Sequence, residues 1–250
     1  KQIIQLQEKL CENFGLSRKE AALGVYDFDR IKWPVEYTEI KPDAIKFIPL
    51  EMSEALTPKE ILSRHEKGIQ YRHLLENASH YPLIIDSARQ VLSMPPIINS
   101  EYTGKVTNST KNVFVEVTGS NYRFILPVLN IMAAALAERG GKIYSVKVLG
   151  KNKITTPDFK PKKAKLNSEY CNRILGTQLK PAEICKLLEK ARFSAKLSGS
   201  LIEASYLPYR QDIMDERDLV EDAAIAYGYQ NLKPEEAKIS AIGKPLDFIT

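Results

Sequence analysis

The sequence has few of the residues that build metal and disulfide sites, with three cysteines and three histidines in 250 residues. Cys11, Cys171 and Cys185 lie far apart, form no CxxC pair and have no histidine at zinc-site spacing. Neither a zinc site nor a disulfide framework is therefore indicated. No apolar run approaches the roughly 18 residues of a membrane span, and the first residues do not resemble a secretory signal. These absences predict reduced thiols in a cytoplasmic protein without a membrane partner.

The rest of the composition is typical of a globular protein, with 44% hydrophobic and 27% charged residues. The net charge of +5 is uneven, because residues 151–170 hold six lysines against one aspartate and one glutamate. From charge alone, a surface that binds phosphate backbones and a solvated linker are equally favoured. Because the chain begins with lysine, we expect it to be a fragment or a processed form.

The stretch 81–119 organises the chain. It contains three predicted strands, which cover residues 83–85, 91–94 and 113–118. The Pro95-Pro96 pair makes the connection after the second strand stiff. Successive strand side chains point to opposite faces, so Glu116 and Thr118 share one face and the valines between them the other. The stretch predicts a small apolar-walled site with four polar groups: Ser93, Asn99, Glu116 and Thr118.

Each of these four residues also has an ordinary structural interpretation. Asn99 can stabilise the turn after the prolines, and Ser93 can face solvent from a strand. Glu116 and Thr118 can lie on the wet side of a sheet. The residues by themselves favour these structural interpretations.

The remaining elements predict a mixed α+β protein with two modules. In the first module we expect helices at residues 2–12 and 57–68, a long helix from 121 to Gly140, and a short helix at Ser17, where Glu20 has capping-box spacing. A basic, proline-containing segment without periodicity follows Gly150 and marks a boundary. Beyond it, helices are predicted at 167–175, 180–191 and 215–227, with a β-hairpin at 193–205.

Four carboxylates form a second candidate site near the last predicted helix: Asp212, Asp218, Glu221 and Asp222. Residues 218, 221 and 222 fall on one helical face, and oxygen-rich clusters suit magnesium. Acids in the first helical turns are also favoured by the helix dipole and by capping. The spacing alone favours this second interpretation.

Three blocks resemble a known family: YPLIIDSARQVLSMPPIIN, VFVEVTG and PYRQDIMDERDLVEDAAIAYGYQN. They are similar, in matching order, to the beta subunit of cytosolic phenylalanyl-tRNA synthetase of the archaeal/eukaryotic type. The resemblance extends from about Leu10 to Asn231. It implies a tRNA-editing domain with a mixed sheet and packed helices at 1–153, and a smaller helix-rich magnesium and assembly module with a β-hairpin at 154–232. It also implies a linker at 233–250 toward a catalytic-like core.

The resemblance also implies partners and residue roles. The partners would be the alpha subunit, in an alpha2-beta2 tetramer, and tRNA(Phe). The alpha subunit would use ATP to attach phenylalanine, and no ATP would bind in this chain. The beta subunit would hydrolyse mischarged tyrosyl-tRNA. Asn99 would read the tyrosine hydroxyl, Ile84 would contact the substrate, and Ser93, Glu116 and Thr118 would position the ester and a water. Asp212, Asp218, Glu221 and Asp222 would hold Mg²⁺ shared with the alpha subunit.

The residues agree with hydrolysis by an oriented water, because the sequence has no Gly-x-Ser-x-Gly elbow and no histidine in the central stretch. Glu116 and Ile84 stand where some family members have aspartate and leucine, and the longer glutamate alters the reach toward a water. The alternative is a non-catalytic module that binds tRNA or assembles subunits.

Overall fold

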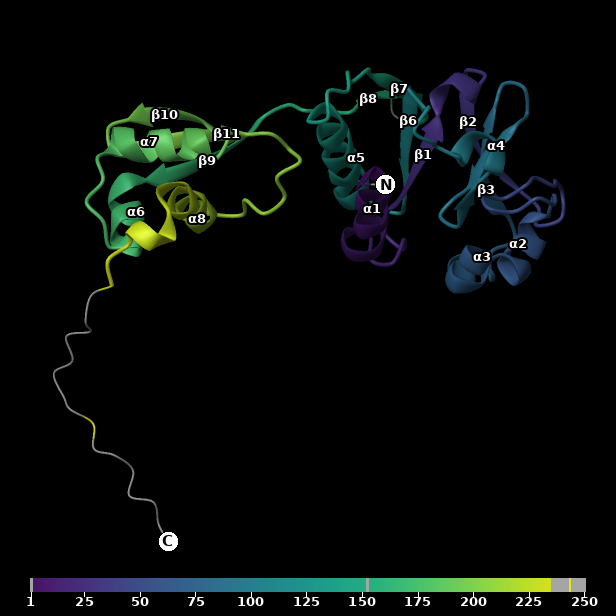
Figure 1. Ribbon diagram of the computed structural model, residues 1–250, viewed down its shortest axis with the longest axis horizontal. Coiled ribbons are helices and arrows are strands. Elements are labelled where there is room, and N and C mark those ends of the chain that lie inside the picture. The colour runs from purple at the N-terminus through teal and green to yellow at the C-terminus, as the bar shows by residue number, and fades with distance from the viewer. Residues whose placement is uncertain (1, 152, 235–242, 244–250) are drawn as a thin grey trace, which may run out of the picture. The chain divides into compact units, whose positions relative to one another are not determined.

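The computed structural model describes residues 2–151, 153–234 and 243, and it divides into two compact units, Lys1–Lys160 and Pro161–Thr250 (Figure 1). The division follows Lys160 and not residue 153, because β7 (Val146–Leu149) and β8 (Lys153–Thr156) pair as an antiparallel hairpin within the first unit. The predicted linker at 233–250 lies almost entirely outside the described residues. Within the described part of the chain, no helix is both long and apolar enough to cross a membrane.

Besides the β7–β8 hairpin, the first unit contains two antiparallel sheets that face each other and are covered by helices on their outer sides (Figure 1). The smaller sheet pairs β1 (Ala22–Asp27) with β6 (Val113–Thr118). Its outer face carries α1 (Gln2–Lys9), the π-helix η1 (Leu10–Phe14) and α5 (Tyr122–Ala137). The predicted core face of strand 113–118 is confirmed for Val115 and Val117, which pack into this outer core, whereas Val113 is exposed.

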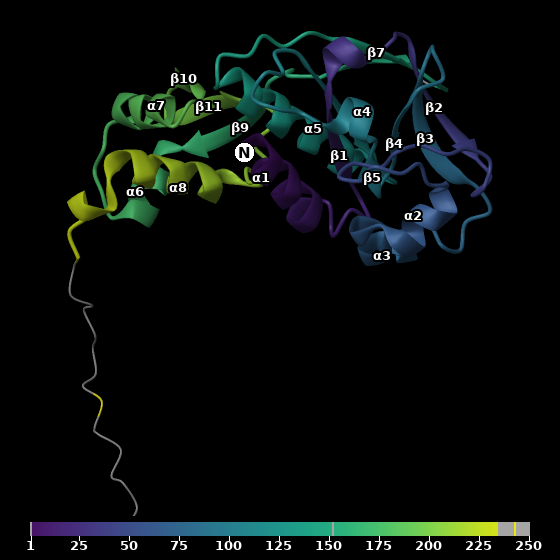
Figure 2. The same ribbon diagram turned by 45° about the vertical axis from the view of Figure 1, so that its right-hand side comes forward.

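The larger sheet has the strand order β2-β3-β4-β5. Its strands are β2 (Val35–Ile40), β3 (Tyr81–Asp86), β4 (Val91–Met94) and β5 (Ile98–Asn99). Two helices that lie side by side, α2 (Pro58–Arg64) and α3 (Glu66–Tyr71), cover its outer face (Figure 2). Short elements complete the unit: η2 (Phe28–Arg30), η3 (Arg72–Leu74) and α4 (Glu101–Gly104). The helix predicted from Thr57 is confirmed, and a capping box between Thr57 and Glu60 starts it.

The space between the two sheets positions the candidate site. A small apolar cluster fills part of it, made by Tyr26, Ile31, Ile84 and Leu92. Strands β3 and β4 pair Ile84 with Ser93 and Ile85 with Val91, so Leu92 is an extra residue that forms a β-bulge. A bulge re-aims the side chains beside it. Both Leu92 and Ser93 therefore face the β1–β6 sheet.

The segment between α1 and β2 differs from the prediction. No helix forms at Ser17, because Leu16, Ser17 and Arg18 have positive φ values of 51°, 51° and 67°. Such left-handed residues cannot start a right-handed helix, and they turn the chain back toward the sheet. Strand β1, which follows the turn, was not predicted, although it crosses the middle of the unit.

The second unit is a three-stranded antiparallel sheet with helices packed on one face. Its strand order is β10 (Ser194–Ser198), β11 (Leu201–Tyr206) and β9 (Lys162–Asn167). Its helices are α6 (Ser168–Leu175), α7 (Pro181–Lys190) and α8 (Glu216–Tyr227), followed by η4 (Tyr229–Asn231). The three helices and the hairpin agree with the prediction.

The basic stretch before α6 was predicted to lack periodicity and to mark a boundary, but its second half forms strand β9. This strand pairs with β11 along its full length. Its Leu166 is fully buried in the core of the second unit, while Lys163 and Lys165 are exposed. The burial of Ala164 and Leu166 at alternate positions outweighs the repulsion among the lysines, which reach solvent on the opposite face.

Candidate active site between two sheets

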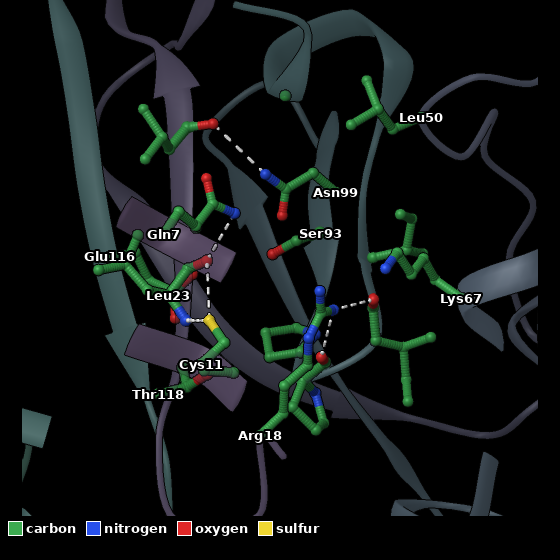
Figure 3. Close-up of a pocket in the computed structure, with 18 of the residues that line it drawn as sticks. Gln7, Cys11, Arg18, Leu23, Leu50, Lys67, Ser93, Asn99, Glu116 and Thr118 are labelled. Carbon is green, nitrogen blue, oxygen red and sulfur yellow. Dashed lines mark hydrogen bonds between the residues drawn. The ribbon is translucent and has the colours of Figure 1, made fainter. Parts of the chain in front are cut away.

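A cavity of about 170 Å³ lies between the two sheets of the first unit. Four of the predicted site residues line it: Ser93, Asn99, Glu116 and Thr118. Figure 3 shows Glu116 and Thr118 on one wall and Ser93 and Asn99 on the facing wall. The four residues come from three strands, so it is the facing of the two sheets that brings them together.

The pairing register of β3, β4 and β5 decides which side chains of the larger sheet face the cavity. Ile84 pairs with Ser93, and Ser93 pairs with Asn99, so the three form a row across β3, β4 and β5. Paired residues in antiparallel strands point to the same face. Ile84, however, does not line the cavity. It is 3% exposed and packs in the apolar cluster with Tyr26.

On the opposite wall, β1 pairs Gly24 with Glu116. Gly24 leaves room for the ring of Tyr26, because a Cβ atom there would lie 2.4 Å from the Tyr26 hydroxyl. The Tyr26 ring can therefore fold back over its own strand toward the centre of the cavity. Glycine is required at position 24 for this close approach.

Tyr26 connects the two walls. Its hydroxyl lies 2.8 Å from Ser93 Oγ and 2.8 Å from Glu116 Oε2. A phenol has one proton, so it donates to one of these oxygens and accepts from a protonated neighbour. Burial raises the pKa of Glu116 to about 7, and the neighbouring hydroxyls of Tyr26 and Thr118 oppose that rise. A carboxyl with this pKa exchanges protons near neutral pH, as a general base must.

Two buried oxygen atoms in the cavity have no hydrogen-bond partner among the described residues: Glu116 Oε1 and Thr118 Oγ1. Buried polar atoms in native proteins are usually paired, so an unpaired couple on one wall needs an explanation. Both atoms belong to residues that line the cavity. They are therefore available to a water or a ligand placed between the walls.

Asn99 is held by its amide nitrogen, which donates to the Val25 carbonyl at 3.3 Å (Figure 3). This contact fixes the side chain across the gap between the sheets and leaves Oδ1 as an acceptor. Gly104 packs directly behind it, since a Cβ atom there would lie 2.3 Å from Asn99 Cβ. The position of Asn99 is thus set by tertiary contacts and not only by its turn.

Arg18 lines the cavity and binds the backbone that follows the Pro95-Pro96 turn. Its guanidinium donates to the carbonyls of Pro96 at 3.2 Å and Ile97 at 2.8 Å, pairs with Glu8 and lies 4.3 Å from the Tyr71 ring centroid. Neither Tyr26 nor Arg18 was predicted to belong to the site. The alternation of Leu23 and Val25 with Gly24 and Tyr26 was the available signal for the strand that carries Tyr26.

Comparison with known proteins shows which family the chain resembles. Residues 164–229 match the family model described as tRNA synthetase B5 domain. The phenylalanine–tRNA ligase beta subunit of Pyrococcus abyssi is 48% identical over 244 residues, which cover 97% of this chain and 44% of that protein. The beta subunit of Methanocaldococcus jannaschii is 44% identical over 255 residues, covering 99% of this chain and 46% of that protein.

A solved structure from the same family also matches this chain. The crystal structure of an N-terminal fragment of the phenylalanyl-tRNA synthetase beta subunit from Pyrococcus horikoshii superposes with a TM-score of 0.87 at 48% identity. The match covers 91% of this chain and 66% of that one. The chain belongs to the phenylalanine–tRNA ligase beta-subunit family. It spans less than half the length of the curated relatives described above.

The B5 region contains the four predicted magnesium ligands, and the structure does not bring them together as a metal site. Asp212 and Asp222 both pair with the guanidinium of Arg210, at 2.5 and 2.7 Å. The bond from Arg210 lowers the pKa of Asp212. A cation placed between these two aspartates would have to displace Arg210.

The other two carboxylates have separate surroundings. Asp218 Oδ2 accepts the backbone N–H groups of Met214 and Asp215 at 2.6 and 2.8 Å, which completes a capping box at the start of α8. Glu221 is exposed on the same helix. Among the described residues, no group of three or more metal-ligating side chains is close enough to hold a metal ion. In this chain the donor set does not fit magnesium, and the helix-capping interpretation accounts for Asp218.

Proposed function

We propose that the residues of the inter-sheet cavity catalyse hydrolysis of mischarged tyrosyl-tRNA(Phe), in which tyrosine is esterified to the tRNA in place of phenylalanine. One observation carries the proposal: two unpaired buried oxygens, on Glu116 and Thr118, face a polar wall with Asn99 across a 170 Å³ cavity. Such an arrangement has hydrogen-bonding capacity that the folded chain leaves unused. An aminoacyl ester supplies the groups that would use it.

The selectivity rests on Asn99. Tyrosine differs from phenylalanine by one hydroxyl, and a hydrophobic pocket rejects an added hydroxyl by only roughly 10². A site that hydrogen-bonds the hydroxyl rejects the analogue without it by roughly 10⁴–10⁵. Asn99 Oδ1 can accept the tyrosine O–H, while phenylalanine would leave that acceptor buried and unpaired.

The chemistry rests on Glu116. Hydrolysis joins a water oxygen to the ester carbonyl carbon and breaks the bond to the ribose oxygen. Glu116 takes a proton from the attacking water and returns it to the departing ribose oxygen. Its pKa of about 7 suits both directions of transfer. Thr118 orients the water through Oγ1, and Tyr26 holds the carboxyl at 2.8 Å.

The test is the rate at which the chain deacylates tyrosyl-tRNA and phenylalanyl-tRNA. We expect a clear preference for tyrosyl-tRNA and a loss of roughly 10² or more in Glu116→Gln, the scale of general-base catalysis. Glu189→Gln is the matched control, because Glu189 is exposed on α7 in the second unit. Equal rates on both substrates, or an unchanged rate in Glu116→Gln, would remove the assignment.

The family name suggests the wider setting. We propose that the complete subunit acts with an alpha subunit, in an alpha2-beta2 tetramer, to attach phenylalanine to tRNA(Phe) in the cytoplasm. ATP would be used by the alpha subunit. Binding of a magnesium ion shared with the alpha subunit would require that this subunit displaces Arg210 from Asp212 or Asp222.

A second candidate function is tRNA binding by the B5 region. Lys165 pairs in register with Glu203, and Glu203 with Lys196, so the outward face of the sheet carries lysines on both sides of one acid. Lys163 pairs with Glu203 at 2.8 Å on the same face. If this face binds tRNA, replacing Lys163, Lys165 and Lys196 by glutamine should flatten the salt dependence of binding. An unchanged salt slope would leave subunit assembly as the role of the region.

A further inference from the structure

An open groove adjoins the cavity on the first unit. Its volume is about 610 Å³, and it shares four lining residues with the cavity: Arg18, Pro95, Pro96 and Thr118. Thr118 therefore stands at the junction, with its unpaired Oγ1. Ligand pockets typically measure roughly 300–1,000 Å³, so the groove fits a larger group and the cavity a smaller one.

We propose that this groove binds the 3′-terminal nucleotide of the aminoacyl-tRNA, with the base against Tyr37. The inference rests on the proposed hydrolysis, because an aminoacyl ester joins a small side chain to a nucleotide through the bond that is cut. With the amino-acid side chain in the 170 Å³ cavity, the ester reaches the junction at Thr118. The ribose and base then continue into the groove.

Tyr37 is placed for stacking. It is 62% exposed and lines the groove from β2, the edge strand of the larger sheet. It pairs in register with Ile84, so it extends the row that runs through Ser93 to Asn99. An exposed tyrosine in line with the site offers a flat face that every base can use.

The charge of the groove fits a phosphate chain. Lys19 and His73 line it and are exposed. The neighbouring Glu20 accepts a hydrogen bond from Ser120 at 2.9 Å, and no carboxylate pairs with Lys19 within the part of the chain that the structure describes. Arg18 is bound to two carbonyls and to Glu8, and its buried Nε has no partner among the described residues. Lys19 is an exposed cation of the groove that can reach a phosphate of the tRNA end.

The experiment uses three probes with the same chain: the trinucleotide CCA, tyrosine ethyl ester and tyrosyl-tRNA. For Tyr37→Ala we expect about tenfold weaker binding of CCA and about a tenfold higher KM for tyrosyl-tRNA, from the lost stacking. Hydrolysis of tyrosine ethyl ester, which has no nucleotide, should stay within twofold. Tyr37→Trp should restore CCA binding. The matched control is Tyr122→Ala, because Tyr122 is 63% exposed at the start of α5 and lines neither space.

The outcomes separate the two proposals. If Tyr37→Ala binds CCA as tightly as the parent, or slows the ethyl ester as much as tyrosyl-tRNA, the groove does not hold the nucleotide. If the parent hydrolyses neither ester but binds CCA in a Tyr37-dependent way, the groove assignment stands and the proposed hydrolysis fails. Lys19→Gln should reduce the salt dependence of CCA binding, and an unchanged slope would remove Lys19 from the phosphate contact.

Discussion

The two units each contain a cluster of polar side chains, and the clusters differ in how completely their atoms are paired. In the first unit, Glu116 and Thr118 lie between two sheets and keep buried oxygens without partners among the described residues. In the second unit, the aspartates are bound to Arg210 or to the backbone at a helix start. Carboxylates that are satisfied by their own chain stabilise the fold. Buried oxygens that are left unsatisfied indicate a place for a ligand.

The largest effect should come from the closed core of the second unit. Leu166 is fully buried there, so Leu166→Ala should lower the free energy of unfolding by about 2–5 kcal/mol. Lys165→Ala, one residue away and exposed, should change it by less than about 0.5 kcal/mol. Urea unfolding measures both. Equal effects of the two substitutions would indicate that residues 162–167 form a solvated linker and not a buried strand.

A pH dependence should mark the open cluster of the first unit. The folded pKa of Glu116, about 7, is raised above its ordinary value of 4.5. The folded chain therefore binds a proton that the unfolded chain releases, and stability falls as pH rises from 4.5 to 7. The loss should be at most about 3 kcal/mol.

Glu116→Gln is the reference for this measurement, because it removes the titration and keeps the shape. The parent and the variant should differ in the pH slope of their unfolding free energy only within this window. If the unfolding free energies of the parent and the variant run parallel between pH 4.5 and 7, the pKa of Glu116 is not raised in the folded chain. In the same range, the deacylation rate should increase with pH, because only the carboxylate accepts a proton.

A smaller effect is expected from Asn99→Ala. It removes a hydrogen bond to Val25 and the acceptor for the tyrosine hydroxyl, so stability should fall by about 0.5–1.5 kcal/mol. The preference for tyrosyl-tRNA over phenylalanyl-tRNA should fall at least tenfold. Asn112→Ala is the control, since Asn112 loses an exposed side-chain bond to Asp29 outside the cavity. Equal selectivity in both variants would make Asn99 structural.

The smallest effect concerns magnesium. Because Arg210 and the α8 cap occupy the carboxylates, adding MgCl₂ should raise Tm no more than NaCl of the same ionic strength. Even at a concentration equal to Kd, a bound ion would add only about 0.4 kcal/mol. Asp218→Ala should cost about 1 kcal/mol through the lost cap, with or without magnesium. A magnesium-specific rise that disappears in Asp212→Asn would contradict this reading.

Local patterns in the sequence determined most of the elements. The alternation at 113–118, the capping box at Thr57 and the Pro181 helix start each act within a few residues, so the elements could be predicted without knowing their neighbours. The left-handed turn at 16–18 was missed because residues other than glycine seldom adopt positive φ, and strand β1 was missed although its alternating residues were a local signal. The charge of the lysine-rich stretch concealed β9, whose buried Leu166 is visible only once β11 lies beside it.

The candidate site shows the same division. The sequence, with its family resemblance, pointed to Ser93, Asn99, Glu116 and Thr118, but not to the Tyr26 hydroxyl that joins two of them. Tyr26 and Glu116 are separated by 90 positions in the chain. The pairing of β1 with β6 sets their distance, and the packing of the two sheets against each other sets the burial of the carboxyl and hence its pKa. Residue types and spacing therefore determined which groups were present, and tertiary structure decided which were paired and which were left for a ligand.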